Sequence, residues 1–199
     1  MVEVGACSPL AHRVPDLERV TQRARGAIEI GDIAFLAQVC LRLDPAPAER
    51  LRLNLPVEPN THTQAHDGRE RETLWIGPDE WLLIGRPETA PNIIAELEQR
   101  LAGVHHSTVD LSSNRATVEI RGSARLELLS KGCSIDLRPT VWTSGKCAQT
   151  LLAGAPVVLQ ERAGDTRIYI RPSYADYLVD WVVDASEEYW ETTSADRWV

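Results

Sequence analysis

Apolar residues recur along this chain with two different periods, which predict helices in some segments and strands in others. The strongest helical period lies in residues 173–189, where apolar residues follow at intervals of three and four and so share one helix face. They are Tyr174, Tyr177, Leu178, Trp181, Val182, Ala185 and Tyr189. Further helices are predicted over 90–101 and 123–131, with Gly103 and Gly132 placed to end them.

A period of two is typical of strands with one buried face, and it is clearest in residues 115–121, where Ala116, Val118 and Ile120 alternate with polar residues. Strands are predicted over 30–43 (one long strand or a pair), 73–85 (a hairpin), 105–111, 115–121, 147–153, 156–162 and 166–171. From Trp81 onward the order is β-α-β-β-α-β with extra strands and a closing helix. This order predicts an α+β fold of the ferredoxin-like, split βαβ kind, with helices packed on one face of an antiparallel sheet.

The remaining segments suggest a simple domain organisation. Residues 1–25 carry mixed charges, two prolines and little periodicity, so we expect an N-terminal arm outside the core. Residues 26–190 are predicted to form a single domain, interrupted by a proline-rich and polar loop at about 56–72. Residues 191–199 are expected to be a frayed tail.

Charge and composition narrow the class of protein. The net charge is −8 and the pI is about 5.2, which disfavours a nucleic-acid partner. No stretch approaches 18 uncharged apolar residues, and the N-terminus lacks the pattern of a secretory signal, so we expect no membrane association. The four cysteines are too scattered for a disulfide framework or a zinc site, and we expect inert thiols in a cytoplasmic protein. They are Cys7, Cys40, Cys133 and Cys147.

The segment HHSTVDLSSNRATVEIRG contains residue types that carry chemistry elsewhere. On a strand, neighbouring side chains point to opposite faces, and His106 and Asp110 would lie roughly 13 Å apart, too far to share a metal ion. Ser112 and Ser113 lack the G-x-S-x-G setting of a nucleophile. We expect Val109 and Leu111 in the core and the polar residues in a turn.

We find no catalytic or cofactor-binding motif elsewhere in the sequence. The chain has neither G-x-G-x-x-G after a strand nor a P-loop motif. His62 and His66 lie in the polar loop, where we expect solvated side chains. No catalytic, cofactor-binding or metal-binding residue is therefore assigned.

The sequence contains six tryptophans but only one phenylalanine, and this composition indicates contacts with a partner protein. Trp75, Trp81 and Trp181 lie on predicted apolar faces and are expected in the core. The other three lie in a loop or near the C-terminus, where burial within one chain is harder, and large aromatic rings of this kind often anchor interfaces. The candidate interface anchors are Trp142, Trp190 and Trp198.

Five segments together resemble the gamma subunit of heterotetrameric sarcosine oxidase over roughly residues 73–185. They read IGPDEWLLIG, STVDLSSNRATVEIRG, LLSKGCSIDL, GKCAQTLLAGAPVVLQ and IRPSYADYLVDWVVDA. That subunit is similar in turn to the folate-binding domain of glycine-cleavage aminomethyltransferases, whose catalytic acid lies in a GG…DD strand. The comparable place here reads AGAPVVLQ, with Pro156, Val157 and Val158, so the resemblance transfers no active-site residue.

The resemblance implies a non-catalytic subunit that supports the oxidative demethylation of sarcosine to glycine, with transfer of the one-carbon unit to tetrahydrofolate. It implies that this chain carries no cofactor, and that FAD, FMN, NAD, zinc and tetrahydrofolate belong to partner subunits. The expected partners are the alpha, beta and delta subunits, mainly alpha.

Two alternatives stay open from the sequence. One is a stand-alone folate-binding protein of the iron–sulfur-cluster-assembly type, whose K-G-C-Y-x-G-Q-[ET] motif is matched only in part by KGCSIDL and GKCAQT. In that case Cys133 or Cys147 would be a reactive thiol. The other is an unrelated ferredoxin-like binding module.

Overall fold

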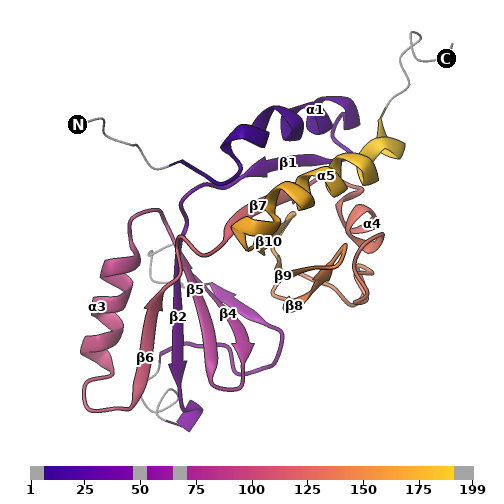
Figure 1. Ribbon diagram of the computed structural model, residues 1–199. Helices are drawn as coiled ribbons and strands as arrows, with labels where there is room; N and C mark the ends of the chain where they lie inside the picture. Colours follow the sequence, from indigo (N-terminus) through magenta and orange to yellow (C-terminus); the bar gives the residue numbers. More distant parts are fainter. Residues whose placement is uncertain (1–6, 47–52, 65–70, 191–199) are drawn as a thin grey trace, which may run out of the picture.

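The computed structural model describes residues 7–46, 53–64 and 71–190, which form two five-stranded antiparallel sheets packed against each other (Figure 1). Sheet A has the strand order β1-β7-β10-β9-β8, and sheet B has the order β3-β4-β5-β2-β6. Helices cover the outer face of each sheet. The α+β class and the antiparallel pairing predicted from the sequence are confirmed, but the strands are divided between two sheets.

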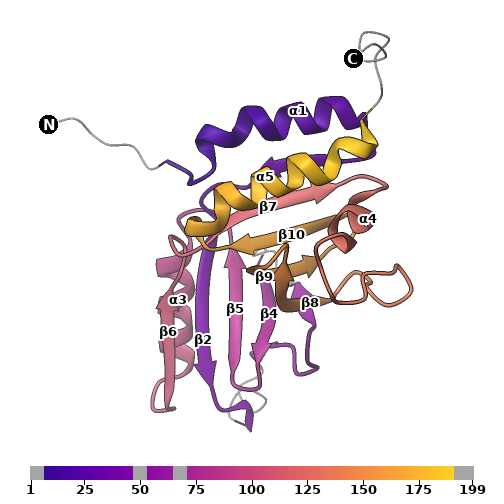
Figure 2. The same cartoon turned by 45° about the vertical axis from the view of Figure 1, so that its right-hand side comes forward.

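Sheet A and its helices contain the larger hydrophobic core. Its strands are β1 (Glu29–Asp32), β7 (Ala116–Arg121), β8 (Cys147–Leu152), β9 (Ala155–Glu161) and β10 (Asp165–Ile170). Its helical elements are η1 (Ala11–Arg13), α1 (Val14–Ala24), α4 (Arg125–Ser130), η2 (Pro172–Tyr174), α5 (Ala175–Ser186) and η3 (Glu187–Tyr189). The helices α1 and α5 lie side by side over the sheet (Figure 2).

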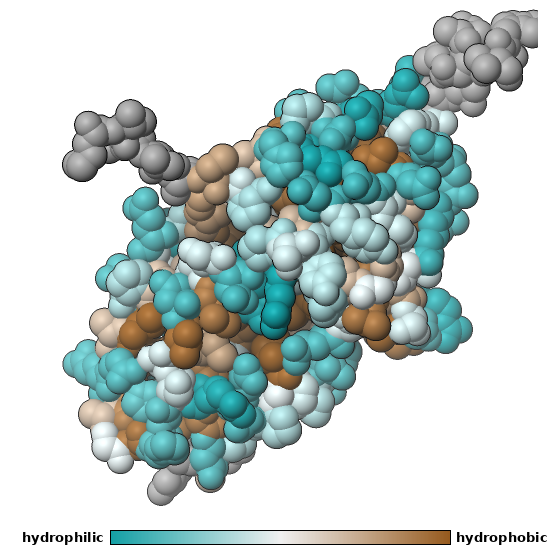
Figure 3. Space-filling view, in the orientation of Figure 1, coloured by the Kyte–Doolittle hydropathy of each residue, from teal (hydrophilic) through white to brown (hydrophobic). Residues whose placement is uncertain are grey.

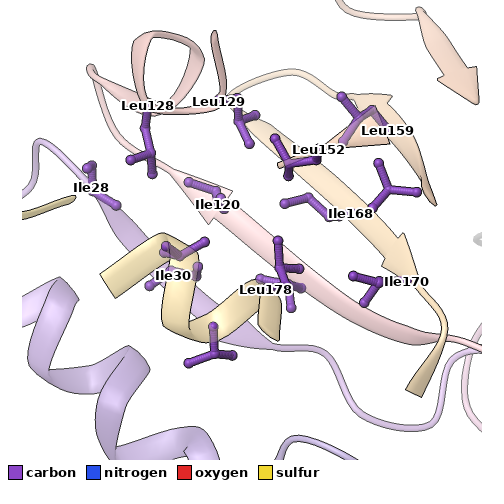
Figure 4. Packing of buried hydrophobic residues seen from close by; sticks show 14 of the residues in the cluster. Ile28, Ile30, Ile120, Leu128, Leu129, Leu152, Leu159, Ile168, Ile170 and Leu178 are labelled. Atoms are coloured by element: carbon purple, nitrogen blue, oxygen red, sulfur yellow. The ribbon is translucent and has the colours of Figure 1, made fainter. Parts of the chain in front are cut away.

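This core is built from large aliphatic side chains that meet between the sheet and the helices. Ile30, Ile120 and Ile168 project from the strands toward Leu128 on α4 and Leu178 on α5 (Figure 4). Each fully buried leucine or isoleucine contributes about 1.5–3 kcal/mol by removing apolar surface from water. The alternation predicted in residues 115–121 therefore holds, because its apolar face is the one that the helices cover.

Sheet B has its own smaller core beneath one helix. Its strands are β2 (Ala37–Leu43), β3 (His62–Gln64), β4 (Glu72–Gly77), β5 (Glu80–Gly85) and β6 (His106–Asp110), and its helix is α3 (Ala90–Arg100). Ile93 and Leu97 of α3 pack against Val39 and Leu41 of β2. The predicted hairpin over 73–85 is confirmed as β4 and β5, which pair with each other.

A mixed polar and apolar layer joins the inner faces of the two sheets. Leu74 and Leu82 of sheet B pack with Val158 and Tyr169 of sheet A. Beside this apolar cluster lies a network of ion pairs, in which two buried carboxylates meet two arginines at 2.8–3.4 Å. The four residues are Glu72, Glu119, Arg162 and Arg167.

The expectation of an N-terminal arm is wrong for residues 14–24, which form α1. Leu17, Val20 and Ala24 are buried on one side of this helix, and Leu10 just before it is fully buried. These apolar residues follow at intervals of three and four with charged residues on the other side, so the sequence does carry the helical period and the expectation of an arm overlooked it. Pro15 lies in the first turn, where its missing N–H leaves no hydrogen bond unmade.

The strands predicted at 105–111 and 115–121 do form, but they do not pair as neighbours. β6 pairs with β2, whereas β7 pairs with β1 and β10 in the other sheet. The turn between them is held to sheet B, since the backbone N–H of Leu111 donates to the carbonyl of Gln38 at 2.7 Å. Val109 is 47% exposed, so its predicted core position is wrong, because β6 is an edge strand whose inner face is open at that point.

Other predicted elements lie within a few residues of their expected bounds. The segment 30–43 gives a pair of strands, β1 and β2, that belong to different sheets. The loop predicted at about 56–72 contains β3 and the first residue of β4. Residues 65–70 and the predicted tail at 191–199 lie outside the described residues.

Candidate functional site

A cavity of about 610 Å³ opens between α4, the segment 137–144 and the β9–β10 turn. On its wall lies the Glu161 carboxylate, whose residue is 2% exposed. This carboxylate accepts hydrogen bonds from Arg125 Nη2 at 2.5 Å, Trp142 Nε1 at 3.2 Å and Thr166 Oγ1 at 2.5 Å. These three donors occupy most of its acceptor sites, so it fixes α4 and the loop of Trp142 to sheet A rather than offering a free base.

The three candidate anchor tryptophans have different environments. Trp142 is 6% exposed within the core of sheet A, so its own chain covers the ring and the reason for proposing it as an anchor is gone. Trp190 is half-buried, with Arg23 stacked 4.9 Å from the ring centre and its N–H donating to Ser186 Oγ at 3.2 Å. Trp198 lies outside the described residues.

Of the three tryptophans expected in the core, one is buried and two are partly covered. Trp81 is 2% exposed, and its N–H donates to the Pro56 carbonyl at 2.8 Å. Trp75 and Trp181 are half-buried.

The two adjacent histidines point to opposite sides, as strand geometry predicts. His105 is exposed, whereas His106 is half-buried with Nδ1 2.8 Å from the Val104 carbonyl and Nε2 3.2 Å from Glu98. Ser112 is a turn residue whose hydroxyl donates to Asp110 at 2.5 Å. Within the described part of the chain, no group of three or more His, Cys, Asp or Glu side chains could hold a metal ion.

His62 is not a solvated loop residue. It lies on β3, its Nε2 is 2.8 Å from the Glu161 carbonyl, and Gln160 Nε2 is 3.3 Å from its Nδ1. The imidazole therefore joins sheet B to sheet A through β9. His66 lies outside the described residues.

Three of the four free cysteines are buried or half-buried. Cys147 donates to the Thr61 carbonyl at 3.1 Å, and its burial raises the pKa of the thiol to about 12. Burial likewise raises the pKa of Cys40 to about 11, with a further contribution from its hydrogen bond to Glu80. Because the thiolate is the nucleophile, neither Cys147 nor Cys40 is poised to react near neutral pH.

A second cavity, of about 150 Å³, lies on the inner face of sheet A. Its wall includes Pro156, Val157 and Val158, the place where the resemblance to aminomethyltransferases would put a catalytic acid. Its rim carries two arginines, Arg115 and Arg171. Sequence reasoning missed both, since nothing in the local pattern shows that residues 56 positions apart lie around one cavity.

The comparisons with known proteins agree with this arrangement. The model of the sarcosine oxidase, gamma subunit family matches residues 41–188. The chain belongs to this family. A sarcosine oxidase subunit gamma from Arthrobacter sp. is 34% identical over 178 residues, covering 85% of each chain. The subunit gamma from Corynebacterium sp. (strain U-96) is 32% identical over 190 residues, covering 92% of this chain and 90% of the relative.

Solved structures give the same result. A chain of heterotetrameric sarcosine oxidase from Corynebacterium sp. U-96, solved with pyrrole 2-carboxylate, superposes with a TM-score of 0.81 at 29% identity. The match covers 94% of this chain and 98% of that one. The glycine cleavage system aminomethyltransferase T from Bartonella henselae matches with a TM-score of 0.63 at 13% identity, over 88% of this chain and 50% of that one. The latter shows a shared fold, and the predicted folate-binding-domain-like class is confirmed.

The structure also bears on the relation to membranes. Among the residues that it describes, no helix has the length and apolar character needed to cross a bilayer.

Proposed function

We propose that this chain is the non-catalytic gamma subunit of a heterotetrameric sarcosine oxidase. The observation that carries the proposal is the superposition on a chain of that heterotetramer over 94% of this chain and 98% of the other, with a TM-score of 0.81. In this role the chain shapes and stabilises a complex that oxidises sarcosine to glycine and passes the one-carbon unit to tetrahydrofolate.

The chemistry of the described side chains supports a structural role. The buried carboxylate of Glu161 is engaged by three donors, and burial keeps Cys147 protonated. Pro156, Val157 and Val158 offer no carboxylate at the place where the resemblance to aminomethyltransferases would put the catalytic acid. The raised pKa of Cys147 also argues against its role as the reactive thiol of a stand-alone folate-binding protein.

The finer parts of the proposal concern partners and cofactors. The partners are the alpha, beta and delta subunits, with docking mainly on alpha, and FAD, FMN, NAD, zinc and tetrahydrofolate are held by those chains. The complex is cytoplasmic, in keeping with a chain whose cysteines are all free. Trp190 and Trp198 are the proposed aromatic anchors of the docking surface.

Co-expression tests this function. The neighbouring candidate subunits are produced with and without this chain, and sarcosine-dependent peroxide formation is measured together with the yield of assembled complex. We expect the yield to fall sharply without this chain, while flavin content per surviving flavoprotein subunit is unchanged. Equal yield and activity in its absence would reject the role.

A further inference from the structure

Two arginines at the 150 Å³ cavity on sheet A lack the carboxylate partners that most other arginines of this chain have. Arg125, Arg162 and Arg167, for example, each form an ion pair with a glutamate. Among the residues that the structure describes, neither Arg115 nor Arg171 forms an ion pair or a side-chain hydrogen bond, although the chain as a whole has a net charge of −8.

The strand register shows that these arginines share one face with the apolar wall of the cavity. Tyr169 lies opposite both Thr117 and Val158, and side chains two residues apart on a strand point the same way. Arg115, two residues before Thr117, and Arg171, two residues after Tyr169, therefore extend the inner face of sheet A toward the edge where both line the cavity.

Arg115 is the more informative of the two because it is partly desolvated. Its Nη1 atom is buried and has no hydrogen-bond partner in the described structure. Burial lowers the pKa of its guanidinium, and the nearby charge of Arg171 acts in the same direction. The nearby carboxylate of Glu80 raises that pKa, but Glu80 accepts the Cys40 thiol at 3.3 Å and forms no ion pair with Arg115. A partly desolvated guanidinium with an N–H donor that has no partner is stabilised when it binds an anion.

The size and walls of the cavity indicate which anion fits. About 150 Å³ is the volume of roughly five water molecules, well below the roughly 300–1,000 Å³ of a drug-sized ligand site. Two guanidinium groups match the two oxygens of a carboxylate, and the apolar side chains of Pro156 and Val158 on the inner face match a short methylene stem. An aspartate or glutamate side chain has this chemistry.

Apolar side chains are exposed on the inner faces of sheets A and B near the cavity. They favour a partner protein, rather than a free small molecule, as the source of the carboxylate. Leu151, opposite Pro156 on β8, is 53% exposed. On sheet B, Val109 lies opposite Cys40, and Cys40 lies opposite Leu82, so the inner face of that sheet ends at a valine that is 47% exposed. Figure 3 shows hydrophobic residues interspersed with hydrophilic ones on the surface of the half of the molecule that contains sheet B. The buried centre of a subunit interface is typically apolar, and arginine is the charged residue that is enriched there.

We propose that Arg115 and Arg171 form a receptor for an aspartate or glutamate side chain of a partner subunit, an inference that rests on the proposed function. In the free chain no carboxylate of the described residues pairs with Arg115. In the complex, the partner's carboxylate supplies the missing acceptor and fixes the register of docking.

The test compares four variants of the full-length chain with the natural one. The variants are Arg115→Gln, Arg115→Lys, Arg171→Gln and, as a matched control, Arg100→Gln on α3, whose guanidinium pairs with Glu96 over the outer face of sheet B. Binding to the complex of the remaining subunits is measured on a biosensor at low and high salt. The melting temperature of each isolated variant is measured alongside.

We expect Arg115→Gln to weaken binding about 30-fold or more, because it leaves a buried carboxylate unpaired. Arg171→Gln should weaken binding up to about fivefold, because an exposed ion pair contributes little. Arg115→Lys should have an intermediate effect on binding, since lysine keeps the charge but cannot donate the two parallel hydrogen bonds of a guanidinium. The isolated Arg115→Gln chain should melt at the same or a higher temperature, because the free chain loses only an unpaired cation. The control should bind unchanged.

Four results would overturn the inference, and they are distinguishable. Unchanged binding of Arg115→Gln with normal assembly rejects the receptor but leaves the proposed function intact. Binding and melting temperature that fall together show that Arg115 is structural. A third result combines two measurements: sodium propionate, but not propionamide or sodium chloride, raises the melting temperature of the natural chain in a saturable way, and Arg115→Gln binds the other subunits as before. This result assigns the cavity to a free small carboxylate. Failure of the natural chain to bind the other subunits rejects the proposed function and this inference together.

Discussion

Replacing Glu161 by glutamine tests whether this carboxylate holds α4 and the loop of Trp142 on sheet A. The substitution keeps the shape and removes the charge. The Glu161 and Arg125 side chains are 3% and 19% exposed, so the variant leaves a largely buried guanidinium without its counter-ion. Breaking a buried pair from one side destabilises a protein by about 3–5 kcal/mol.

The expected loss lies at the lower end of that range. The glutamine carbonyl still accepts from Thr166 or Trp142, and Arg125 keeps some contact with water. We therefore expect the free energy of unfolding to fall by about 3 kcal/mol, a large share of the roughly 5–15 kcal/mol that stabilises a typical domain. Glu58→Gln is the matched control, because Glu58 is 75% exposed and lies 3.9 Å from Lys146. That change should stay within about 0.5 kcal/mol.

Urea denaturation followed by tryptophan fluorescence provides the measurement. The midpoint should fall with little change in the slope m, which shows that stability and not the extent of unfolding has changed. Arg125→Gln and the double variant complete a thermodynamic cycle, and we expect the double variant to lose about 1–3 kcal/mol less than the sum of the two single variants. A loss below about 1 kcal/mol in Glu161→Gln, or strict additivity in the cycle, would refute the reasoning.

Four further predictions concern packing, thiol chemistry and docking. Gly132→Ala would place a methyl group 2.6 Å from Trp181 Cζ2, so calorimetry should show a loss of about 1–3 kcal/mol from overpacking; an unchanged melting temperature would contradict this. In the native protein a maleimide followed by mass spectrometry should label exposed Cys7 and leave Cys147 unmodified, and native labelling of Cys147 would be inconsistent with its burial. Burial raises the pKa of the Cys147 thiol from 9.0 to about 12, so the folded protein favours the protonated thiol. The thiol's contribution to the free energy of unfolding should therefore be complete below about pH 9 and should be lost as the pH rises to about 12. Trp190→Ala should weaken subunit binding by about tenfold or more in the biosensor assay, and unchanged affinity would remove it as an anchor.

Local periodicity is what made parts of the fold predictable. The helix α3 and the strand β7 have apolar residues at regular intervals along one face, and neighbouring residues alone determine that pattern. The helix α1 also has apolar residues at helical intervals, Leu17, Val20 and Ala24, so its helical form could have been predicted, whereas its packing against α5 and β1 is a long-range feature of the fold. The division of strands between two sheets depends on long-range pairs such as Val39 with Asp110.

The environments of functional side chains were less accessible to sequence reasoning. The burial of Trp142 depends on Glu161, 19 residues away, and the position of His62 depends on the backbone of the same residue. Arg115 follows a Ser-Ser-Asn turn and looks like any exposed arginine in the sequence. That no described side chain pairs with Arg115 depends on which residues the fold brings around it, and the local sequence does not contain this information.

The mass and activity of the complex recovered through an affinity tag on this chain test the central claim most directly. The tagged chain is produced together with the candidate alpha, beta and delta subunits, purified through the tag, and weighed by native mass spectrometry while peroxide formation from sarcosine is assayed. A four-chain complex that contains this chain and carries the sarcosine-dependent activity is the predicted result. Recovery of the tagged chain alone, with the activity retained by the other three chains in the unbound fraction, would contradict the account.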